Sequence, residues 1–210
     1  MNMQTIIAIL IGYAFGCIQS AFLISKFVGK IDIREYGSGN AGASNITATM
    51  GWKYGIIVGL VDVLKGMFAV LVVKWIYPDS PDLAFLSGMM AVIGHIFPFY
   101  MKFKGGKGVA ALVGMMIGVD WKLGLLFALL VIVPAAITDY IVSGSFTTFI
   151  ALPIATYFLG HPLSFILLGI CLTILCFYLH RFNIQRILKK EELKISTVIK
   201  GKHEKAAAKF

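Results

Sequence analysis

The segment "EYGSGNAGASN", residues 35 to 45, combines very small side chains with hydrogen-bond donors. Glycine accepts positive φ and allows close approach to the backbone, so successive amides in such a loop can form a nest around an anion. We therefore predict that the loop holds a phosphate or a developing oxyanion, and the alternative is a flexible Gly/Ser connector. The residues expected to contact the anion are Ser38, Gly39, Asn40, Gly42, Ser44 and Asn45.

A second polar segment reads "GHIFPFYMKFKGGKG", in which Lys104 and Lys107 bracket Gly105 and Gly106. It looks superficially like a nucleotide phosphate loop. A Walker A loop requires Ser or Thr after its lysine and a strand before it, whereas here Gly108 follows the lysine and the flanking residues are apolar. The segment is therefore predicted to bind an anion without nucleotide hydrolysis.

Ionisable residues also occur inside apolar stretches. In "DVLKG", Asp62 and Lys65 lie three residues apart, on one face of a helix. A lone charge in mid-membrane costs roughly 2.5 to 3.5 kcal/mol, so we predict that the two pair, with a charge relay toward the glycine loops as the alternative. His95 has three candidate roles: general base, charge stabiliser, or hydrogen-bonding group within a helix bundle. Pro98 is predicted to break or bend the helix after it.

The elements that position these residues are predicted to be membrane helices. The 210 residues are 59% hydrophobic, and the mean hydropathy is +0.86. Several stretches approach the roughly 20 apolar residues that cross about 30 Å of hydrocarbon. The fold class predicted is an all-α polytopic membrane protein with about seven spans, the fourth of which is short enough to be a re-entrant or tilted helix. The predicted spans are 3–25, 54–77, 83–101, 108–119, 121–142, 146–160 and 163–180.

Charge sets the predicted orientation. Most of the 19 Lys and Arg residues fall on one side of this path, which predicts an amino terminus outside and a carboxyl terminus in the cytoplasm. The net charge of +9 is explained by a basic stretch from Arg181 to Lys209 beside the membrane. The predicted domains are one membrane domain, residues 1–190, and a basic cytoplasmic tail, residues 191–210. Such a tail attracts anionic lipid headgroups rather than nucleic acid. The three cysteines have no metal-ligand spacing, so no metal is expected.

On this path three polar clusters share the cytoplasmic face: the two glycine loops and "HRFNIQR", residues 180 to 186. A smaller patch formed by Asp139, Tyr140, Ser143 and Ser145 ends the fifth predicted span on the same side. We expect these clusters to form one site.

Taken in chain order, "GSGNAGASN", "DVLKG", "GHIFPFYMKFKGGKGVA" and "HRFNIQRIL" resemble the bacterial acyl-phosphate:glycerol-3-phosphate acyltransferase family of the PlsY type. The resemblance covers nearly the whole chain. It implies transfer of a fatty acyl group from acyl phosphate to the 1-hydroxyl of glycerol 3-phosphate, which forms lysophosphatidic acid for phospholipid biosynthesis. It also implies a bacterial inner-membrane enzyme with a cytoplasmic active site, no cofactor or metal, and a functional link to a soluble enzyme that makes acyl phosphate.

The resemblance assigns roles to individual residues. Ser38, His95 and Lys107 match the catalytic positions, although whether His95 is base or scaffold stays open. An acyl phosphate is already activated, so positioning and charge stabilisation suffice, and the substrate's own phosphate can accept the proton. The residues implied to bind substrate are Gly39, Asn40, Gly42, Ser44, Asn45, Lys104, Gly105, Gly106, Ser145, His180 and Asn183, with Lys107 also touching the acceptor phosphate.

The chain departs from the family pattern in two places. Ala48 stands where the first motif usually has an arginine that holds the acceptor phosphate, and Lys190 stands where the third motif has a glycine. The match around Ser145 is loose. These departures suggest a divergent paralogue. Two other functions therefore stay open: a membrane transporter for a phosphorylated anion, and a catalytically silent protein that binds lipid phosphate.

Overall fold

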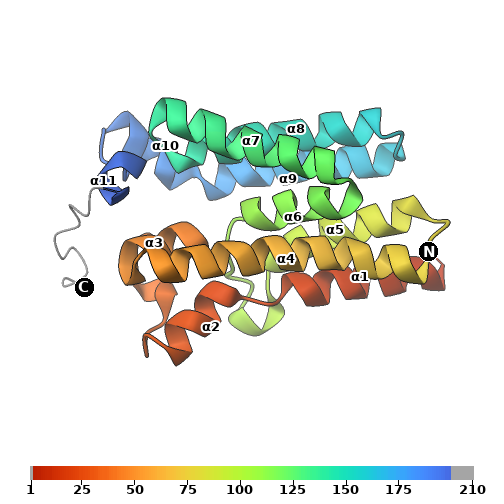
Figure 1. Ribbon diagram of the computed structural model, residues 1–210, viewed down its shortest axis with the longest axis horizontal. Coiled ribbons are helices and arrows are strands. Elements are labelled where there is room, and N and C mark those ends of the chain that lie inside the picture. The colour runs from red at the N-terminus through yellow and green to blue at the C-terminus, as the bar shows by residue number, and fades with distance from the viewer. Residues whose placement is uncertain (1, 200–210) are drawn as a thin grey trace. The chain divides into compact units, whose positions relative to one another are not determined.

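The computed structural model describes residues 2–199, and within this range all regular structure is helical (Figure 1). The all-α prediction is confirmed. The chain forms two compact units, unit 1 up to Gly124 and unit 2 from Leu125 onward. In chain order the elements are α1 (Met3–Gly16), α2 (Ser20–Phe27), η1 (Ile33–Glu35), α3 (Ala43–Met50), α4 (Trp52–Ile76), α5 (Pro81–Ile96), η2 (Phe99–Met101), α6 (Val109–Val119), α7 (Trp121–Thr138), α8 (Ile141–Phe158), α9 (Leu163–Leu179), α10 (Arg181–Leu188) and α11 (Ile195–Ile199).

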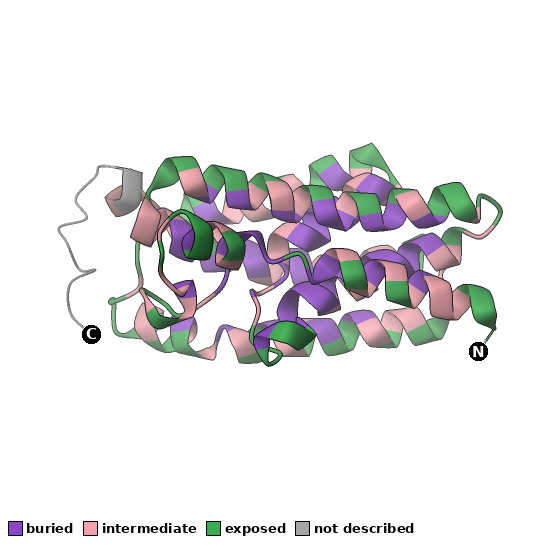
Figure 2. Cartoon of the chain, turned by 90° about the horizontal axis from the view of Figure 1, so that it is seen from below, coloured by how far each residue is buried: buried purple, intermediate pink, exposed green. Residues whose placement is uncertain are grey.

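Within the described residues, five helical segments are long and apolar enough to cross a membrane: Met3–Phe27, Trp52–Ile76, Pro81–Met101, Trp121–Thr138 and Ile141–Phe158. A sixth is added if α9 and α10, which are bent by 48°, act as one span. The predicted fourth span is α6, whose 11 residues are fewer than the roughly 20 of a typical crossing, in keeping with the short fourth helix predicted from the sequence. Large apolar side chains are exposed along these helices, as lipid contact requires (Figure 2). The chain is therefore a multi-pass membrane protein.

In unit 1, α4 packs against α5 and α6, and α1 packs against α5. Small residues make the close helix contacts, as is usual in membranes. A Cβ atom added to Gly66 would overlap the Ala111 carbonyl on α6, and one added to Gly114 would overlap the Val63 carbonyl on α4. The backbones of α4 and α6 therefore touch, which holds the short α6 in place.

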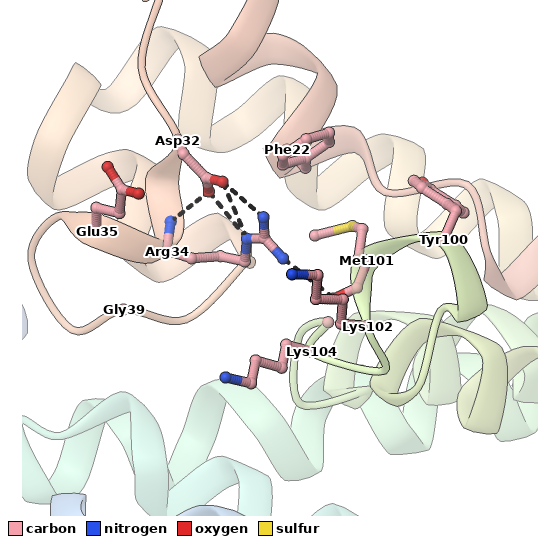
Figure 3. Close-up of a pocket in the computed structure, with 10 residues that line it drawn as sticks. Phe22, Asp32, Arg34, Glu35, Gly39, Tyr100, Met101, Lys102 and Lys104 are labelled. Carbon is pink, nitrogen blue, oxygen red and sulfur yellow. Dashed lines mark hydrogen bonds and ion pairs between the residues drawn. The ribbon is translucent and has the colours of Figure 1, made fainter.

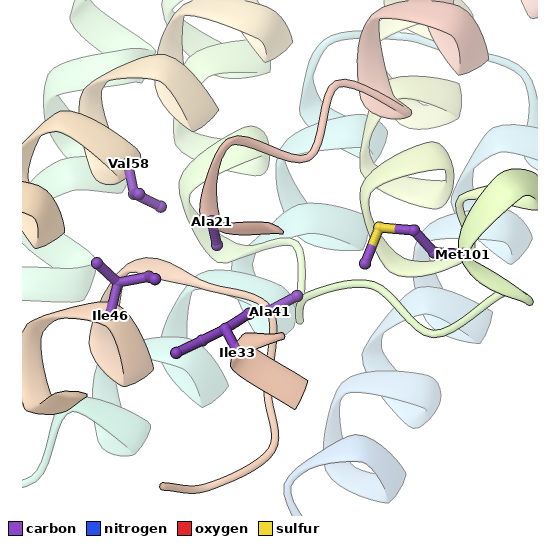
Figure 4. Packing of buried hydrophobic residues seen from close by; sticks show 6 residues of the cluster. All are labelled: Ala21, Ile33, Ala41, Ile46, Val58 and Met101. Carbon is purple, nitrogen blue, oxygen red and sulfur yellow. The ribbon is translucent and has the colours of Figure 1, made fainter. Parts of the chain in front are cut away.

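A small apolar cluster fixes the segments around the glycine loops of unit 1 (Figure 4). It joins residues from α2, η1, α3, α4 and η2 with one residue of the first loop itself. Each side chain is at most 2% exposed. The members are Ala21, Ile33, Ala41, Ile46, Val58 and Met101. Because both polar loops are attached to this one buried cluster, their positions are fixed relative to each other.

Two helix boundaries test the predictions. The break at Pro98 is confirmed, because α5 ends at Ile96 and Pro98 caps η2. The predicted spans 121–142 and 146–160 were wrong at their junction, since α7 ends at Thr138 and α8 begins at Ile141. Asp139 at this break adopts a left-handed conformation with φ 63°, which ends the helix. Ser145 therefore lies within α8 and not in a loop.

The predicted basic tail, residues 191–210, begins in unit 2. Its described part contains α11, whose backbone and side chains bond to Asp139. Ser196 donates from its amide to Asp139 Oδ1 at 2.8 Å and from its hydroxyl to Oδ2 at 2.5 Å. The rest of the predicted tail, residues 200–210, lies outside the described residues.

Candidate functional site

The first glycine loop is closed by one side chain, Asn45 of α3, which is 2% exposed. Its Nδ2 lies within hydrogen-bond distance of the carbonyl oxygens of Ile33 (3.1 Å), Tyr36 (2.9 Å) and Asn40 (3.0 Å). Its Oδ1 accepts the Ser38 amide at 2.9 Å. The Asn45 amide thus fixes the shape of the loop, and its predicted contact with substrate stays a prediction.

Two loop residues require glycine. Gly37 (φ 57°) and Gly39 (φ 71°) adopt left-handed conformations, and a Cβ on Gly37 would overlap Asn45 Oδ1. Ser38 lies exposed between them. Because its amide is already bonded to Asn45, Ser38 offers the proposed anion its hydroxyl rather than its N–H.

The loop continues into the amino end of α3. Gly42 caps this helix without a side chain, and its amide donates to the Asn40 carbonyl at 3.0 Å. Ser44 is exposed in the first helical turn. The first-turn amides of a helix carry partial positive charge, which suits an anion. The loop runs directly into the start of α3, and anion binding at this position stays a prediction.

The second glycine loop folds back onto the end of α5. The amide of Gly105 donates to the Ile96 carbonyl at 3.0 Å, and that of Gly106 donates to the His95 carbonyl at 3.0 Å. A Cβ on Gly106 would overlap His95 Nε2 and lie 2.7 Å from the Ala41 carbonyl of the first loop. Both glycine loops and the His95 ring therefore meet at Gly106.

His95 is 3% exposed and held by its surroundings. Gln19 Nε2 donates to the His95 carbonyl at 3.0 Å. The ring Nδ1 lies 3.7 Å from Asp62 Oδ1, which is too long for a hydrogen bond. Among the described residues Nδ1 has no hydrogen-bond partner. The contacts that fix His95 are thus to its backbone and to Gly106.

The Asp62–Lys65 pair predicted from sequence is confirmed, with a separation of 2.9 Å between Nζ and Oδ1 and side chains that are 2–3% exposed. Ser20 Oγ also donates to Asp62 Oδ1 at 2.9 Å, and Lys65 Nζ donates to the Ile18 carbonyl at 2.6 Å. A buried ion pair needs such additional hydrogen bonds to offset its desolvation. This cluster joins α4 to the break between α1 and α2.

A second ion pair, missed from sequence, lies just before the first glycine loop, and its arginine also bonds to the segment before the second loop (Figure 3). Arg34 Nε and Nη2 donate to the Asp32 carboxylate at 2.6–3.2 Å, and Nη1 donates to the Met101 carbonyl at 3.1 Å. These hydrogen bonds from Arg34 lower the pKa of Asp32 below its usual value. The acid-x-base spacing in "DIRE" was the available signal.

The two lysines of the second loop have different environments. Lys104 is exposed and lines a pocket with Gly39 and Gly105. Lys107 is half-buried and precedes Gly108, which begins α6 in a left-handed conformation with φ 85°. The binding of an anion by this loop stays a prediction.

The remaining predicted residues belong to unit 2. Ser145 of α8 and His180 at the end of α9 are 5% and 2% exposed. The Cys176 thiol lies between them, 3.9 Å from the Ser145 carbonyl and 3.5 Å from His180 Nδ1. His180 Nδ1 also lies 2.8 Å from the Cys176 carbonyl, so this nitrogen carries the proton. The His180 and Phe146 rings pack in an edge-to-face arrangement, with centroids 5.4 Å apart.

Asn183, on α10, is 8% exposed and is fixed by an acidic residue that sequence reasoning missed. Asn183 Nδ2 donates to Glu192 Oε1 at 2.6 Å, while Arg186 Nε donates to Glu192 Oε2 at 2.6 Å. The chain turns back between them at Lys190, whose φ is 60°. Glu192 therefore orients one predicted substrate-binding residue.

The predicted site residues thus form two sets, one in each unit. Unit 1 brings together the two glycine loops and His95, and unit 2 brings together Ser145 and His180, with Asn183 on the helix that follows. A family model described as "Glycerol-3-phosphate acyltransferase" matches residues 6–190. The chain belongs to the glycerol-3-phosphate acyltransferase family. The resemblance found in the sequence is confirmed, and so is the prediction of an acyltransferase.

Curated glycerol-3-phosphate acyltransferases are similar over nearly their full length. Glycerol-3-phosphate acyltransferase 1 of Oceanobacillus iheyensis is 38% identical, with 93% of this chain and 97% of the relative covered. The acyltransferase of Thermoanaerobacter pseudethanolicus is 35% identical, with 92% of this chain and 96% of the relative covered.

Two crystal structures of PlsY, an integral membrane glycerol 3-phosphate acyltransferase, share the fold at 30% identity. The glycerol 3-phosphate form has a TM-score of 0.83 and covers 95% of this chain and 99% of its own. The lysophosphatidic acid form has a TM-score of 0.75 and covers 93% and 98%. The membrane acyltransferase fold therefore extends over almost the whole chain.

Proposed function

We propose that this protein transfers a fatty acyl group from acyl phosphate to the 1-hydroxyl of glycerol 3-phosphate and forms lysophosphatidic acid. The observation that carries the proposal is the meeting of both glycine loops at Gly106, beside His95 and the Ala41 carbonyl. The similarity to a PlsY structure in its glycerol 3-phosphate form supports the choice of acceptor.

In the proposed reaction the acceptor hydroxyl oxygen attacks the acyl carbonyl carbon. The new ester bond forms between this oxygen and the carbonyl carbon. The bond between the carbonyl carbon and the phosphate oxygen breaks, and inorganic phosphate leaves. The hydroxyl proton passes to a phosphate oxygen. The Ser38 hydroxyl, the first-turn amides of α3 and Lys107 stabilise the developing negative charge, and no nucleophile on the protein is needed.

In this proposal the unit 2 set holds the acceptor. His180 and Ser145 contact glycerol 3-phosphate, and Glu192 fixes the Asn183 amide for the same purpose. His95 acts mainly as a scaffold, because its contacts are to its backbone and to Gly106.

We also propose a bacterial inner-membrane location with the site facing the cytoplasm. The chain would cross seven times, with α6 as the short fourth crossing, an outer amino terminus and a cytoplasmic carboxyl terminus. The Lys and Arg distribution supports this orientation. The membrane domain would span 1–190, and a soluble enzyme would supply acyl phosphate.

Orientation is tested by cysteines at exposed positions in a Cys171→Ser background. Lys104→Cys and Glu35→Cys are expected to react only with reagent supplied from the cytoplasm, and Asp79→Cys only from outside. A cysteine within the second glycine loop at Gly106 is avoided, because its side chain would overlap His95. Labelling of Lys104→Cys and Glu35→Cys from opposite sides would contradict a single site.

Ala48 favours one other function, that of a catalytically silent protein that binds lipid phosphate. The position lies on α3, one turn after Asn45, and alanine carries no donor for a phosphate. A silent protein would bind glycerol 3-phosphate or its acylated product without forming an ester.

The deciding experiment supplies purified protein with acyl phosphate and a panel of glycerol phosphates and measures acyl ester by mass spectrometry. Ester formation is expected with glycerol 3-phosphate. Ser38→Ala is expected to lower turnover by about 10² to 10³-fold, as for loss of a preorganised oxyanion donor. Lys107→Ala should also lower it, whereas the exposed Lys53→Ala should not. Binding without ester supports the silent protein, and uptake into vesicles without ester supports a transporter.

A further inference from the structure

A pocket of about 390 Å³ opens in unit 1 between η1 and η2 (Figure 3). Its cationic lining residues are Arg34, Lys102 and Lys104, and its acidic ones are Asp32 and Glu35. Positive charge is therefore in excess by one. Such a pocket at the end of membrane helices is a candidate site for an anion.

The charges of the lining are not balanced pairwise. Asp32 is bonded to Arg34, whereas within the described residues no ion pair involves Lys102 or Lys104. In Figure 3 both lysine side chains extend from the η2 segment toward the loop that carries Arg34 and Gly39. Three cations and two carboxylates line one pocket, so one positive charge is left for a further anion.

The Arg34 guanidinium is preorganised for this purpose. Asp32 and the Met101 carbonyl hold it at 2.6–3.2 Å, and its side chain is 27% exposed. A guanidinium has more N–H donors than these contacts use. The remaining donors can therefore reach an anion without further loss of side-chain freedom, which favours a planar or tetrahedral oxyanion such as phosphate.

The rest of the lining indicates where the anion comes from. Phe22 and Tyr100 form an aromatic wall of the pocket. Phe99 and Phe103 beside it are 63% and 59% exposed. Exposed aromatic rings at the ends of membrane helices lie among lipid chains and headgroups. The pocket thus offers cations to a phosphate and aromatic rings to an apolar group attached to that phosphate.

We propose that this pocket is a second anion site, which binds the phosphate of an anionic lipid headgroup or of a free phosphate monoester. Ser38, His95 and Lys107 are not among its lining residues, whereas Gly39, Lys104 and Gly105, which the resemblance assigns to substrate binding, are. The pocket therefore adjoins the predicted substrate site, and an anion bound at Arg34 and Lys102 restrains both glycine loops. The proposal does not depend on the acyl-transfer reaction.

The test uses full-length protein in uncharged maltoside micelles and phosphate-free buffer. The midpoint of thermal unfolding is measured against inorganic phosphate, dihexanoylphosphatidate or, as a zwitterionic control, dihexanoylphosphatidylcholine. A ligand that binds the folded state raises this midpoint in a concentration-dependent way. All variants are made in a Lys107→Ala background, which weakens binding at the proposed reaction site.

Lys102→Gln is expected to weaken the apparent affinity for phosphatidate about fivefold, which corresponds to roughly 1 kcal/mol for one lysine at a membrane surface. Lys53→Gln removes an equally exposed lysine outside the pocket and should change nothing. In the otherwise native protein, Lys102→Gln should leave acyl transfer in phosphatidylcholine micelles unchanged, which separates this site from the reaction.

The two anion sources are distinguished by the same titrations. Equal affinities for inorganic phosphate and phosphatidate support a site for free phosphate, and a preference for phosphatidate supports a lipid headgroup. We expect the preference, because the aromatic wall contacts the lipid chains. Equal affinities of Lys102→Gln and Lys53→Gln for every probe would overturn the proposal.

Discussion

The two sets of predicted site residues are built in opposite ways. In unit 1 the backbone forms the site: glycines pack against His95 and Asn45, and amides bond to carbonyls. In unit 2 side chains on helices form it, and they are held by the Glu192 carboxylate and by the carbonyl and thiol of Cys176. Added atoms should therefore disturb the first set most. Removal of atoms or charges should disturb the second set most.

The difference follows from the ligand groups that each set offers. A backbone nest needs close approach and fixed φ values, which only glycine allows at several successive positions. Imidazole and amide groups on helices need orientation instead, because their χ angles are otherwise free. Each of the following variants tests one side of this contrast.

The largest effect is expected for Gly106→Ala. The new methyl would overlap His95 Nε2 and crowd the Ala41 carbonyl, so both glycine loops must shift. A displacement of about 1 Å can cost roughly 10²-fold in rate, and we expect at least that loss in steady-state turnover.

Gly59→Ala is the matched control, because its Cβ would meet only the Ala43 methyl at 3.7 Å, an ordinary contact. Near-normal turnover in Gly106→Ala, or an equal loss in Gly59→Ala, would show that the glycine loops do not set the reaction geometry.

The next effect concerns unit 2. Glu192→Ala removes the acceptor for Asn183 and Arg186, and we expect a loss of about 2–3 kcal/mol in the free energy of unfolding, since charged hydrogen bonds contribute about 1.5–3 kcal/mol. Glu192→Gln keeps an acceptor oxygen and should lose about half as much. Denaturant unfolding monitored by circular dichroism measures both.

The adjacent Glu191 is exposed, so Glu191→Ala should stay within about 0.5 kcal/mol of wild type. If Glu191→Ala and Glu192→Ala lose the same stability, the carboxylate contacts of unit 2 are not what holds its site residues.

Much of this contrast could be read from the sequence. The Asp62–Lys65 pair and the break at Pro98 depend on local residue types, and the structure bears them out, whereas anion binding by the glycine loops stays a prediction. The roles of Asn45 and Glu192 could not be read, because Asn45 bonds backbone groups up to 12 residues away and Glu192 bonds across a turn. The α7–α8 junction was misplaced because no proline or glycine marks Asp139.

Ala48→Arg should improve the proposed enzyme. Position 48 follows Asn45 by one helical turn, so a side chain there projects from the face of α3 that holds the first loop. An arginine can bind phosphate bidentately, and one charged hydrogen bond of about 1.5 kcal/mol corresponds to roughly a tenfold gain in kcat/KM for glycerol 3-phosphate.

Ala48→Gln, which adds length without charge, is the control and should gain less. If the native protein already binds glycerol 3-phosphate in the low micromolar range and Ala48→Arg changes nothing, another residue has taken over the role of the arginine.

The smallest effect tests the turn that brings Glu192 back to Asn183. Lys190 adopts φ 60°, where any residue with a Cβ pays about 1 kcal/mol or more, whereas glycine does not. Lys190→Gly should therefore raise the free energy of unfolding by about 0.5–1 kcal/mol, the strain relief being partly offset by the greater freedom of glycine in the unfolded chain. Lys189 has an ordinary φ of −83°, so Lys189→Gly should lower stability instead. Opposite signs at these neighbouring positions would show that backbone strain, and not loss of a lysine charge, decides the effect. Equal and negative changes at both would mean that the Lys190 turn is not strained, and that the departure from glycine costs unit 2 nothing.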